Sequence, residues 1–111
     1  LINAAEPGSL EQLISDVEQV GPIDTMVYNL GAQIGNLSLE KTSLKTFELG
    51  WKIACFGLFR LATALVPLMA ARGKGTFLVT SATSAMRGNA GQHSHAAAMA
   101  GRRLLCQTLN A

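Results

Sequence analysis

The chain has 111 residues, of which 49% are hydrophobic and 14% are charged, so it is long enough for one compact domain and too apolar to be disordered. Its net charge of +2 comes from nine basic and seven acidic residues that are scattered along the sequence. That distribution argues against a nucleic-acid-binding surface. Because the chain opens in an apolar stub at Leu1 without an initiator methionine, we expect it to be a piece of a longer polypeptide.

The first half of the chain predicts a helix followed by a short strand. Apolar residues recur at helical spacing from Ser9 to about Gly21. A strand is predicted over residues 23–29, where the adjacent apolar residues Met26 and Val27 are typical of a strand covered on both faces.

A second helix, a second strand and a third helix follow. The second helix is predicted over residues 43–71, and Pro67 is expected to bend or shorten its final turns. Because Arg60 and Pro67 interrupt its apolar stretch, a buried helix is favoured over a membrane span. A strand is predicted over residues 76–80, a loop over 81–91 and a last helix over 92–109. This alternation indicates an α/β fold with a parallel sheet.

The end of the first strand, Tyr28-Asn29-Leu30-Gly31, resembles the Asn-Asn-Ala-Gly motif of the short-chain dehydrogenase/reductase (SDR) family. Asn29 and Gly31 are retained, whereas Tyr28 and Leu30 replace the other two residues. A glycine at a strand end lets a ligand come close, and an asparagine can tie neighbouring strands through its amide. The same residues are also common in ordinary turns.

Four further segments extend the resemblance over essentially the whole chain. Residues 3–10 resemble the family's stretch after its third strand, with Asn3 in place of an acidic residue that contacts adenine. Residues 51–59 resemble the central helix, residues 75–82 resemble the fifth strand, and residues 88–101 have the layout of the active-site helix. The resemblance implies a Rossmann-type doubly wound parallel sheet with helices on both faces, of which residues 1–111 form the incomplete central part of one domain.

At each of the family's four catalytic positions this chain carries another residue. His95 stands at the Tyr position and Met99 at the Lys position, four residues later. Counting back from His95 by the family's spacing reaches Ala82 at the Ser position, and the Asn position falls on Ala54. Hydroxyl side chains flank Ala82 at Ser81, Thr83 and Ser84. We interpret them as ordinary loop residues, and the alternative is that one of them offers its hydroxyl to a substrate oxygen.

The substitutions of Tyr and Lys change the proton chemistry together. A tyrosine needs a nearby cation to act as a base near neutral pH, and Met99 cannot supply one. An imidazole exchanges protons near neutrality without such help, and a neighbouring ammonium would disfavour its charged form. The pair His95 and Met99 is therefore coherent with a histidine-based site, and equally coherent with decay after catalysis was lost.

The resemblance implies an oxidoreductase that uses NAD or NADP to interconvert a small-molecule carbonyl and an alcohol. His95 would be its proton donor or acceptor, and its nicotinamide pocket would be bordered by Asn29, Gly31, Thr80 and His95. The Gly-rich turn that holds the pyrophosphate in such folds does not occur in this sequence, so we expect it, and the last strands, outside residues 1–111. A non-catalytic cofactor-sensing or dimerisation module is the alternative, and an unrelated α/β binding domain is a third hypothesis.

Other residues bear on the oligomeric state, the cellular compartment, metal binding and burial. Small residues in the last helix and the apolar long helix favour a homodimer or homotetramer. Two distant cysteines favour the reducing cytoplasm. The pair His93 and His95 lacks further ligands, so no metal site is expected. We interpret Trp51 and the phenylalanines as core residues, and Arg102 and Arg103 as a solvated or subunit-facing edge.

Overall fold

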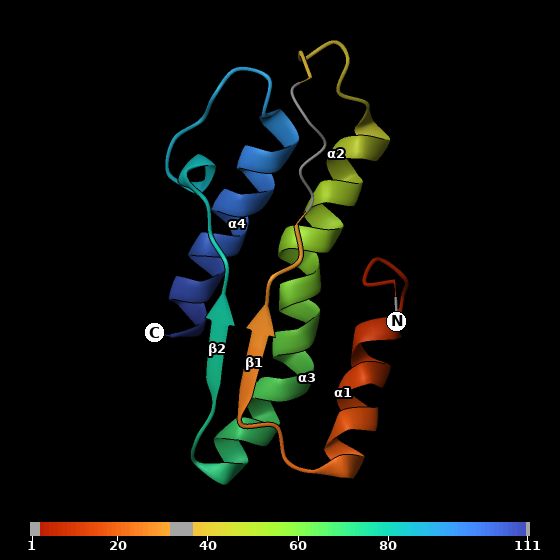
Figure 1. The fold of residues 1–111 in the computed structure, drawn as a ribbon, viewed down its shortest axis with the longest axis vertical. Coiled ribbons are helices and arrows are strands. Elements are labelled where there is room, and N and C mark those ends of the chain that lie inside the picture. The colour runs from red at the N-terminus through yellow and green to blue at the C-terminus, as the bar shows by residue number, and fades with distance from the viewer. Residues whose placement is uncertain (1–2, 32–36, 111) are drawn as a thin grey trace.

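The computed structural model describes residues 3–31 and 37–110, and it consists of a two-stranded parallel sheet with helices packed on it (Figure 1). Residues 1 and 2, which include the apolar opening, lie outside the described part. The predicted alternation of helices and strands is confirmed. In chain order the elements are α1 (Ser9–Val20), β1 (Thr25–Tyr28), α2 (Leu44–Trp51), the π-helical segment η1 (Lys52–Phe56), α3 (Gly57–Arg72), β2 (Thr76–Val79), the 3₁₀ turn η2 (Thr83–Ala85) and α4 (His93–Leu109).

The two strands run in the same direction, with Met26 opposite Phe77 and Tyr28 opposite Val79. A parallel pair needs a long crossover, because the chain must return to the edge where the first strand began. The continuous helix formed by α2, η1 and α3 provides this return (Figure 1). Both strands therefore end at the same edge of the sheet, and the residues that follow them lie beside each other there.

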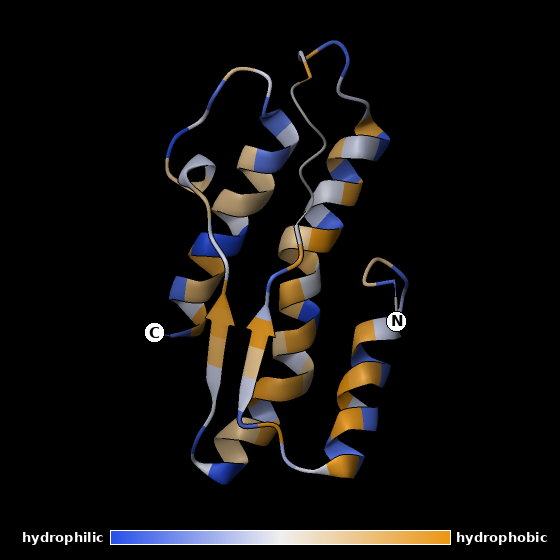
Figure 2. Cartoon of the chain, viewed as in Figure 1, coloured by the Kyte–Doolittle hydropathy of each residue, from blue (hydrophilic) through white to orange (hydrophobic). Residues whose placement is uncertain are grey.

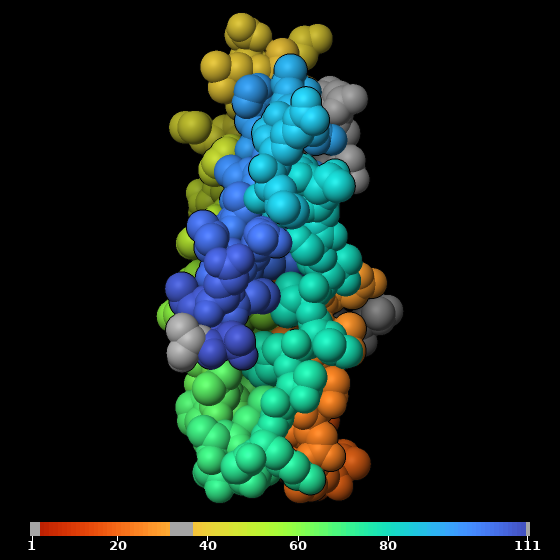
Figure 3. Space-filling view, turned by 90° about the vertical axis from the view of Figure 1, so that its left-hand side faces the viewer, coloured from red at the N-terminus to blue at the C-terminus, as the bar shows by residue number. Residues whose placement is uncertain are grey.

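Within the described residues, the helices cover one face of the sheet. Met26 and Tyr28 are buried, whereas Val27 is 63% exposed and Leu78 is 54% exposed. The other face is therefore uncovered within the described residues, as expected of an incomplete portion of a doubly wound sheet. The resulting two-layer body measures 47 × 28 × 16 Å, and Figure 3 looks onto α4 with β2 visible beside it.

The core lies between this covered face and the helices α1, α3 and α4. α1 presents its apolar stripe to the sheet, and α3 contributes Leu58 and Leu65, which are fully buried. Burying a leucine stabilises a fold by about 1.5 to 3 kcal/mol. The strands and the inner helix surfaces accordingly form one hydrophobic region in Figure 2. Its buried members are Leu10, Ile14, Met26, Tyr28, Leu58, Leu61, Leu65 and Met69.

The long helix is continuous from Leu44 to Arg72. Pro67 lies within α3, which continues to Arg72, so the expected shortening of its last turns does not occur. By length and composition this helix could cross a membrane. In the structure its inner side forms the middle of the core, as expected of a buried helix, and 44% of its most apolar window is buried.

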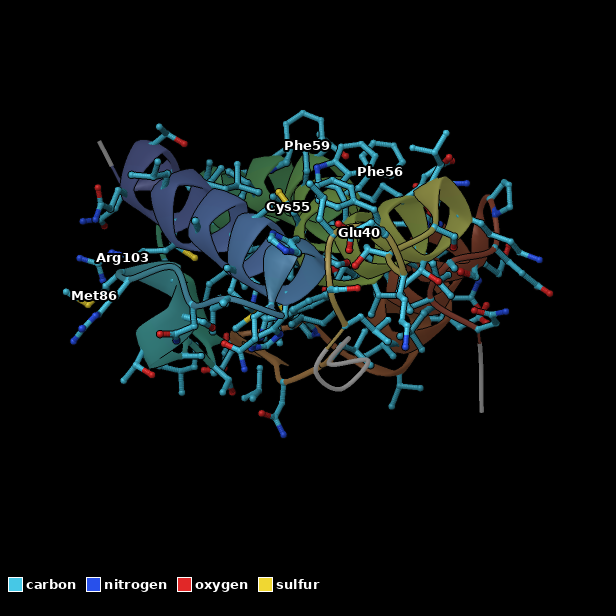
Figure 4. All side chains as sticks on the ribbon, turned by 90° about the horizontal axis from the view of Figure 1, so that it is seen from above. Glu40, Cys55, Phe56, Phe59, Met86 and Arg103 are labelled. Atoms are coloured by element: carbon cyan, nitrogen blue, oxygen red, sulfur yellow. The ribbon has the colours of Figure 1, made fainter. Side chains whose placement is uncertain are left out.

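The outer side of the long helix carries exposed aromatic rings, contrary to the expectation that they are core residues. Trp51 and Phe56 stack with ring centroids 5.0 Å apart, and both are more than a third exposed. Phe59 is 47% exposed. Figure 4 shows Phe56 and Phe59 directed away from the strands. We call Trp51, Phe56 and Phe59 the aromatic patch.

Tyr28 joins β1 to the π-helical segment. Its hydroxyl donates a hydrogen bond to the Ile53 carbonyl, and its ring is buried in the core. The phenol fits because residue 57 is a glycine. A Cβ built there would overlap the Tyr28 hydroxyl oxygen and lie 3.2 Å from the Lys52 carbonyl oxygen.

We expect Gly57→Ala to lower the free energy of unfolding by about 1 to 3 kcal/mol, because the added methyl displaces a buried ring from its hydrogen bond. Chemical denaturation measures this change. Gly88→Ala is the matched control, because a Cβ at Gly88 meets nothing within 4 Å. Equal stability of the two variants would show that the Tyr28 ring has room to move.

Candidate functional site

The residues that follow β1 and β2 form a polar, open edge. The Thr80 hydroxyl donates to the amide oxygen of Asn29 over 2.5 Å, which confirms that this asparagine ties the neighbouring strands. Both side chains are exposed. Gly31 is exposed as well, and a Cβ added there would meet nothing within 4 Å. Three of the predicted pocket residues are therefore gathered at the carboxyl edge of the sheet, where open α/β sheets bind their ligands.

Arg102 supports this edge from inside the protein. It is 2% exposed, so the expectation of a solvated arginine at this position is wrong. Its Nε and Nη2 donate to the Thr80 carbonyl oxygen over 3.1 and 2.7 Å, and its Nη1 donates to the Leu30 carbonyl oxygen over 2.6 Å. A longer bond of 3.5 Å joins Nη1 to the Ala54 carbonyl oxygen. One side chain thus links both strand ends to the long helix.

The charge of Arg102 is balanced by oxygens and an aromatic ring. The guanidinium carbon lies 5.1 Å from the centre of the Tyr28 ring, over its face, which attracts a cation. Among the described residues no carboxylate forms a salt bridge with Arg102. Burial lowers the pKa of the guanidinium and raises the pKa of the Tyr28 phenol. An arginine nevertheless stays protonated in proteins, so a net positive charge lies beneath the strand ends.

Three of the four positions assigned to catalysis meet in one apolar cluster. Ala54 and Met99 are buried against Ala98, and Ala82 packs onto them. Met99 is 4% exposed. The structure therefore brings together three of the four positions that the spacing aligned, from η1, the start of η2 and α4. None of these side chains can exchange a proton.

His95 is the titratable residue among the four positions, and it lies in the first turn of α4. It is half-buried and lines a small hollow together with Thr42, Thr46 and Ser94. The buried hydroxyl of Ser94 has no hydrogen-bond partner among the described residues, and the same holds for Ser84 in η2. Among the described residues, the hollow that His95 lines includes neither the Asn29–Thr80 edge nor the apolar cluster around Met99.

Asn3 has a local role in the structure. Its amide oxygen accepts a hydrogen bond of 3.0 Å from the Ala5 backbone nitrogen, and it is exposed. The turn around it is fixed by Arg60, which donates to the Ala4 carbonyl over 2.7 Å and pairs with Glu11 over 2.7 Å. The bond from Arg60 holds the pKa of the Glu11 carboxyl below its usual range. No bond joins Asn3 to the Asn29–Thr80 edge within the described part of the chain.

Sequence reasoning missed Tyr28 and Arg102 as site residues. Tyr28 was noted only as a departure from the family motif, and its buried hydroxyl bond depends on the distant Gly57. Arg102 did carry a signal. It lies four residues after the buried Ala98 and three before Leu105, which packs on the core. That spacing puts it on the inner face of α4.

The arrangement is a Rossmann-type α/β fold: parallel strands, a helical crossover and polar residues at the carboxyl edge. The family model of short chain dehydrogenases matches residues 2–111. The chain belongs to the short-chain dehydrogenase family. The hypothesis of an unrelated α/β domain is thereby overturned.

Solved structures with this fold span more than the present chain. It is similar to a short-chain dehydrogenase from Rhodopseudomonas palustris, with 26% identity and a TM-score of 0.92, over 97% of this chain and 50% of that one. A gluconate 5-dehydrogenase from Burkholderia cenocepacia in complex with NADP and tartrate has 24% identity and a TM-score of 0.89, over 97% and 42%.

An alcohol dehydrogenase from the archaeon Thermococcus sibiricus, complexed with 5-hydroxy-NADP, has 23% identity and a TM-score of 0.87, over 98% of this chain and 46% of that one. No curated protein matches the sequence significantly. The chain spans half or less of the length of these solved structures.

We expect Met99→Lys to lower the free energy of unfolding by about 3 kcal/mol, because it places an unpaired ammonium in an apolar cluster one helical turn from Arg102. Met99→Leu is the control and should cost less than about 1.5 kcal/mol, since it conserves volume and polarity. Thermal or chemical unfolding compares the two. If the lysine variant matches the leucine variant, the site has kept room for the family's lysine.

Proposed function

We propose that this chain forms the nicotinamide-facing part of an NAD- or NADP-dependent oxidoreductase that interconverts a small-molecule carbonyl and an alcohol. The observation that carries the proposal is the open polar edge of Asn29, Gly31 and Thr80 in a chain that belongs to the short-chain dehydrogenase family. Solved structures of the same fold hold NADP or a derivative of it, according to their descriptions.

The residues at the edge fit a nicotinamide. Asn29 and Thr80 offer exposed amide and hydroxyl groups that can bond to a carboxamide or a ribose. The open space at Gly31 allows a flat ring to approach the backbone. When bound, the nicotinamide supplies or accepts the hydride. Asn3 is proposed to serve the adenine side, through the backbone turn that its side chain fixes.

His95 is proposed to move the proton. It would donate to the oxygen of a carbonyl that is being reduced, or accept from the hydroxyl of an alcohol that is being oxidised. The apolar cluster around Met99 would exclude water from the reacting carbon. The Ser94 hydroxyl, which has no hydrogen-bond partner among the described residues, would hold a water or a substrate oxygen.

We expect His95→Ala to reduce cofactor-dependent turnover of a responsive carbonyl by 100-fold or more, in keeping with loss of general acid catalysis. Cofactor affinity should change little. The measurement is the absorbance of NADPH or NADH over a panel of aldehydes and ketones, with the complete polypeptide that contains this chain. Gln107→Ala is the control, because Gln107 is exposed on the same helix and does not line the hollow that His95 lines. Full activity of His95→Ala would remove the imidazole from the mechanism.

One observation favours a second function, a non-catalytic cofactor-sensing or dimerisation module. Ala54, Ala82 and Met99 leave three catalytic positions without any group that can transfer a proton. In that case the cofactor would raise the melting temperature of the protein without being turned over. The assay above separates the two functions, because only the oxidoreductase consumes reduced cofactor.

We also propose that the protein self-associates as a homodimer or homotetramer through the aromatic patch of Trp51, Phe56 and Phe59. Stacked rings on a solvent-facing helix are typical of protein interfaces. The setting we propose is the reducing cytoplasm. Cys55 and Cys106 form no disulfide, and burial raises the pKa of both thiols, which favours the unreactive thiol form.

We expect Phe59→Glu to shift the protein towards the monomer, because it places a charge in the middle of the aromatic patch. Sedimentation velocity or light scattering measures the weakening, which should be at least tenfold in the dimer dissociation constant. Met86→Glu is the control, since Met86 is exposed and lies well away from the patch (Figure 4). An unchanged oligomer in Phe59→Glu would mean that another surface pairs the subunits.

A further inference from the structure

We propose that Arg102 is a positioning residue of the nicotinamide pocket, which fixes both strand ends and places a fixed positive charge beneath them. This inference rests on the proposed function. It adds that the pocket favours the reduced cofactor over the oxidised one.

Arg102 holds the backbone at the border of the proposed pocket, which is formed by Asn29, Gly31 and Thr80. Its two bonds to the Thr80 carbonyl hold the residue whose hydroxyl binds Asn29. Its bond to the Leu30 carbonyl holds the peptide between Asn29 and Gly31. Each of the three border residues is thus fixed directly by the guanidinium or through one neighbour. A planar group with five donors can make these bonds at once, whereas an ammonium cannot match their directions.

Packing alone does not explain why the charged side chain of Arg102 is buried. A buried charge is costly unless it is paired or hydrogen-bonded. Here the compensation comes from carbonyl oxygens and the Tyr28 ring, which are neutral groups. The full positive charge therefore persists beneath the strand ends. In Figure 2 the middle of α4 is strongly hydrophilic beside the end of β2.

A fixed cation next to the pocket distinguishes the two states of a nicotinamide. The oxidised ring carries a positive charge and the reduced ring is neutral. Repulsion in a partly dry site weakens binding of the oxidised form, while the reduced form is unaffected. The same charge would favour a substrate oxygen that becomes negative during reduction.

The test measures dissociation constants of NADPH and NADP⁺, and of NADH and NAD⁺, by calorimetry with the complete polypeptide. We expect the native protein to bind the reduced form more tightly. Arg102→Met should bring the two affinities about tenfold closer together, while Arg102→Lys keeps the native ratio. Arg103→Met is the control, since Arg103 is the neighbouring arginine on α4. An equal loss of both affinities in Arg102→Met, or no loss, overturns the electrostatic role.

A second measurement works without cofactor. Amide hydrogen exchange of residues 29–31 and 79–81 should speed up about tenfold in Arg102→Lys, because the lysine keeps the charge but loses the fork of donors. The rest of the protein should exchange as before. Native exchange at these amides in Arg102→Lys overturns the positioning role. If the native protein binds none of the four nucleotides, the proposed function fails, and this measurement still decides whether Arg102 positions the strand ends.

Discussion

The carboxyl edge of the sheet depends on one buried cation. Arg102 comes from α4, yet it bonds to backbone oxygens that follow β1 and β2 and reaches the carbonyl of Ala54 in the long helix. Without it, the part-buried carbonyls of Leu30 and Thr80 would lose the donors that link them to α4. The positions of Asn29, Gly31 and Thr80 follow from these bonds. The candidate site is therefore built by the interior of the protein.

A single region thus combines two different environments. On the side of Ala54, Ala82 and Met99 it is dry and apolar. On the side of Asn29 and Thr80 it is polar and open. A nicotinamide has a similar division, since one face of its ring can lie on apolar side chains while the carboxamide bonds to polar groups.

The sequence was sufficient to predict the order of the elements, because helical periodicity is a local property, and the motif spacing selected three residues that pack together, Ala54, Ala82 and Met99. The sequence also indicated that the side chain of Asn29 can link neighbouring strands, although it did not identify Thr80 as the partner. The roles of Arg102 and of the aromatic rings were wrong, for a physical reason. Whether an arginine at the middle of a helix is buried depends on carbonyls supplied by distant strands, and whether Phe59 is covered depends on which face of the helix the sheet occupies. The spacing of Arg102 from Ala98 and Leu105 indicates the inner face of α4, but the carbonyl partners that make its burial possible cannot be inferred from the residues beside it.

The phenol of Tyr28 and the missing side chain at Gly57 have an evolutionary consequence. The hydroxyl occupies the volume that any larger residue at position 57 would need, and its bond to Ile53 uses a carbonyl of the π-helical turn. If Gly57 is replaced first, the larger side chain collides with the Tyr28 hydroxyl. If Tyr28 is first replaced by a shorter side chain, a void remains beside Gly57. Each of these two positions therefore restricts the other, and ancestral sequences should change them as a pair.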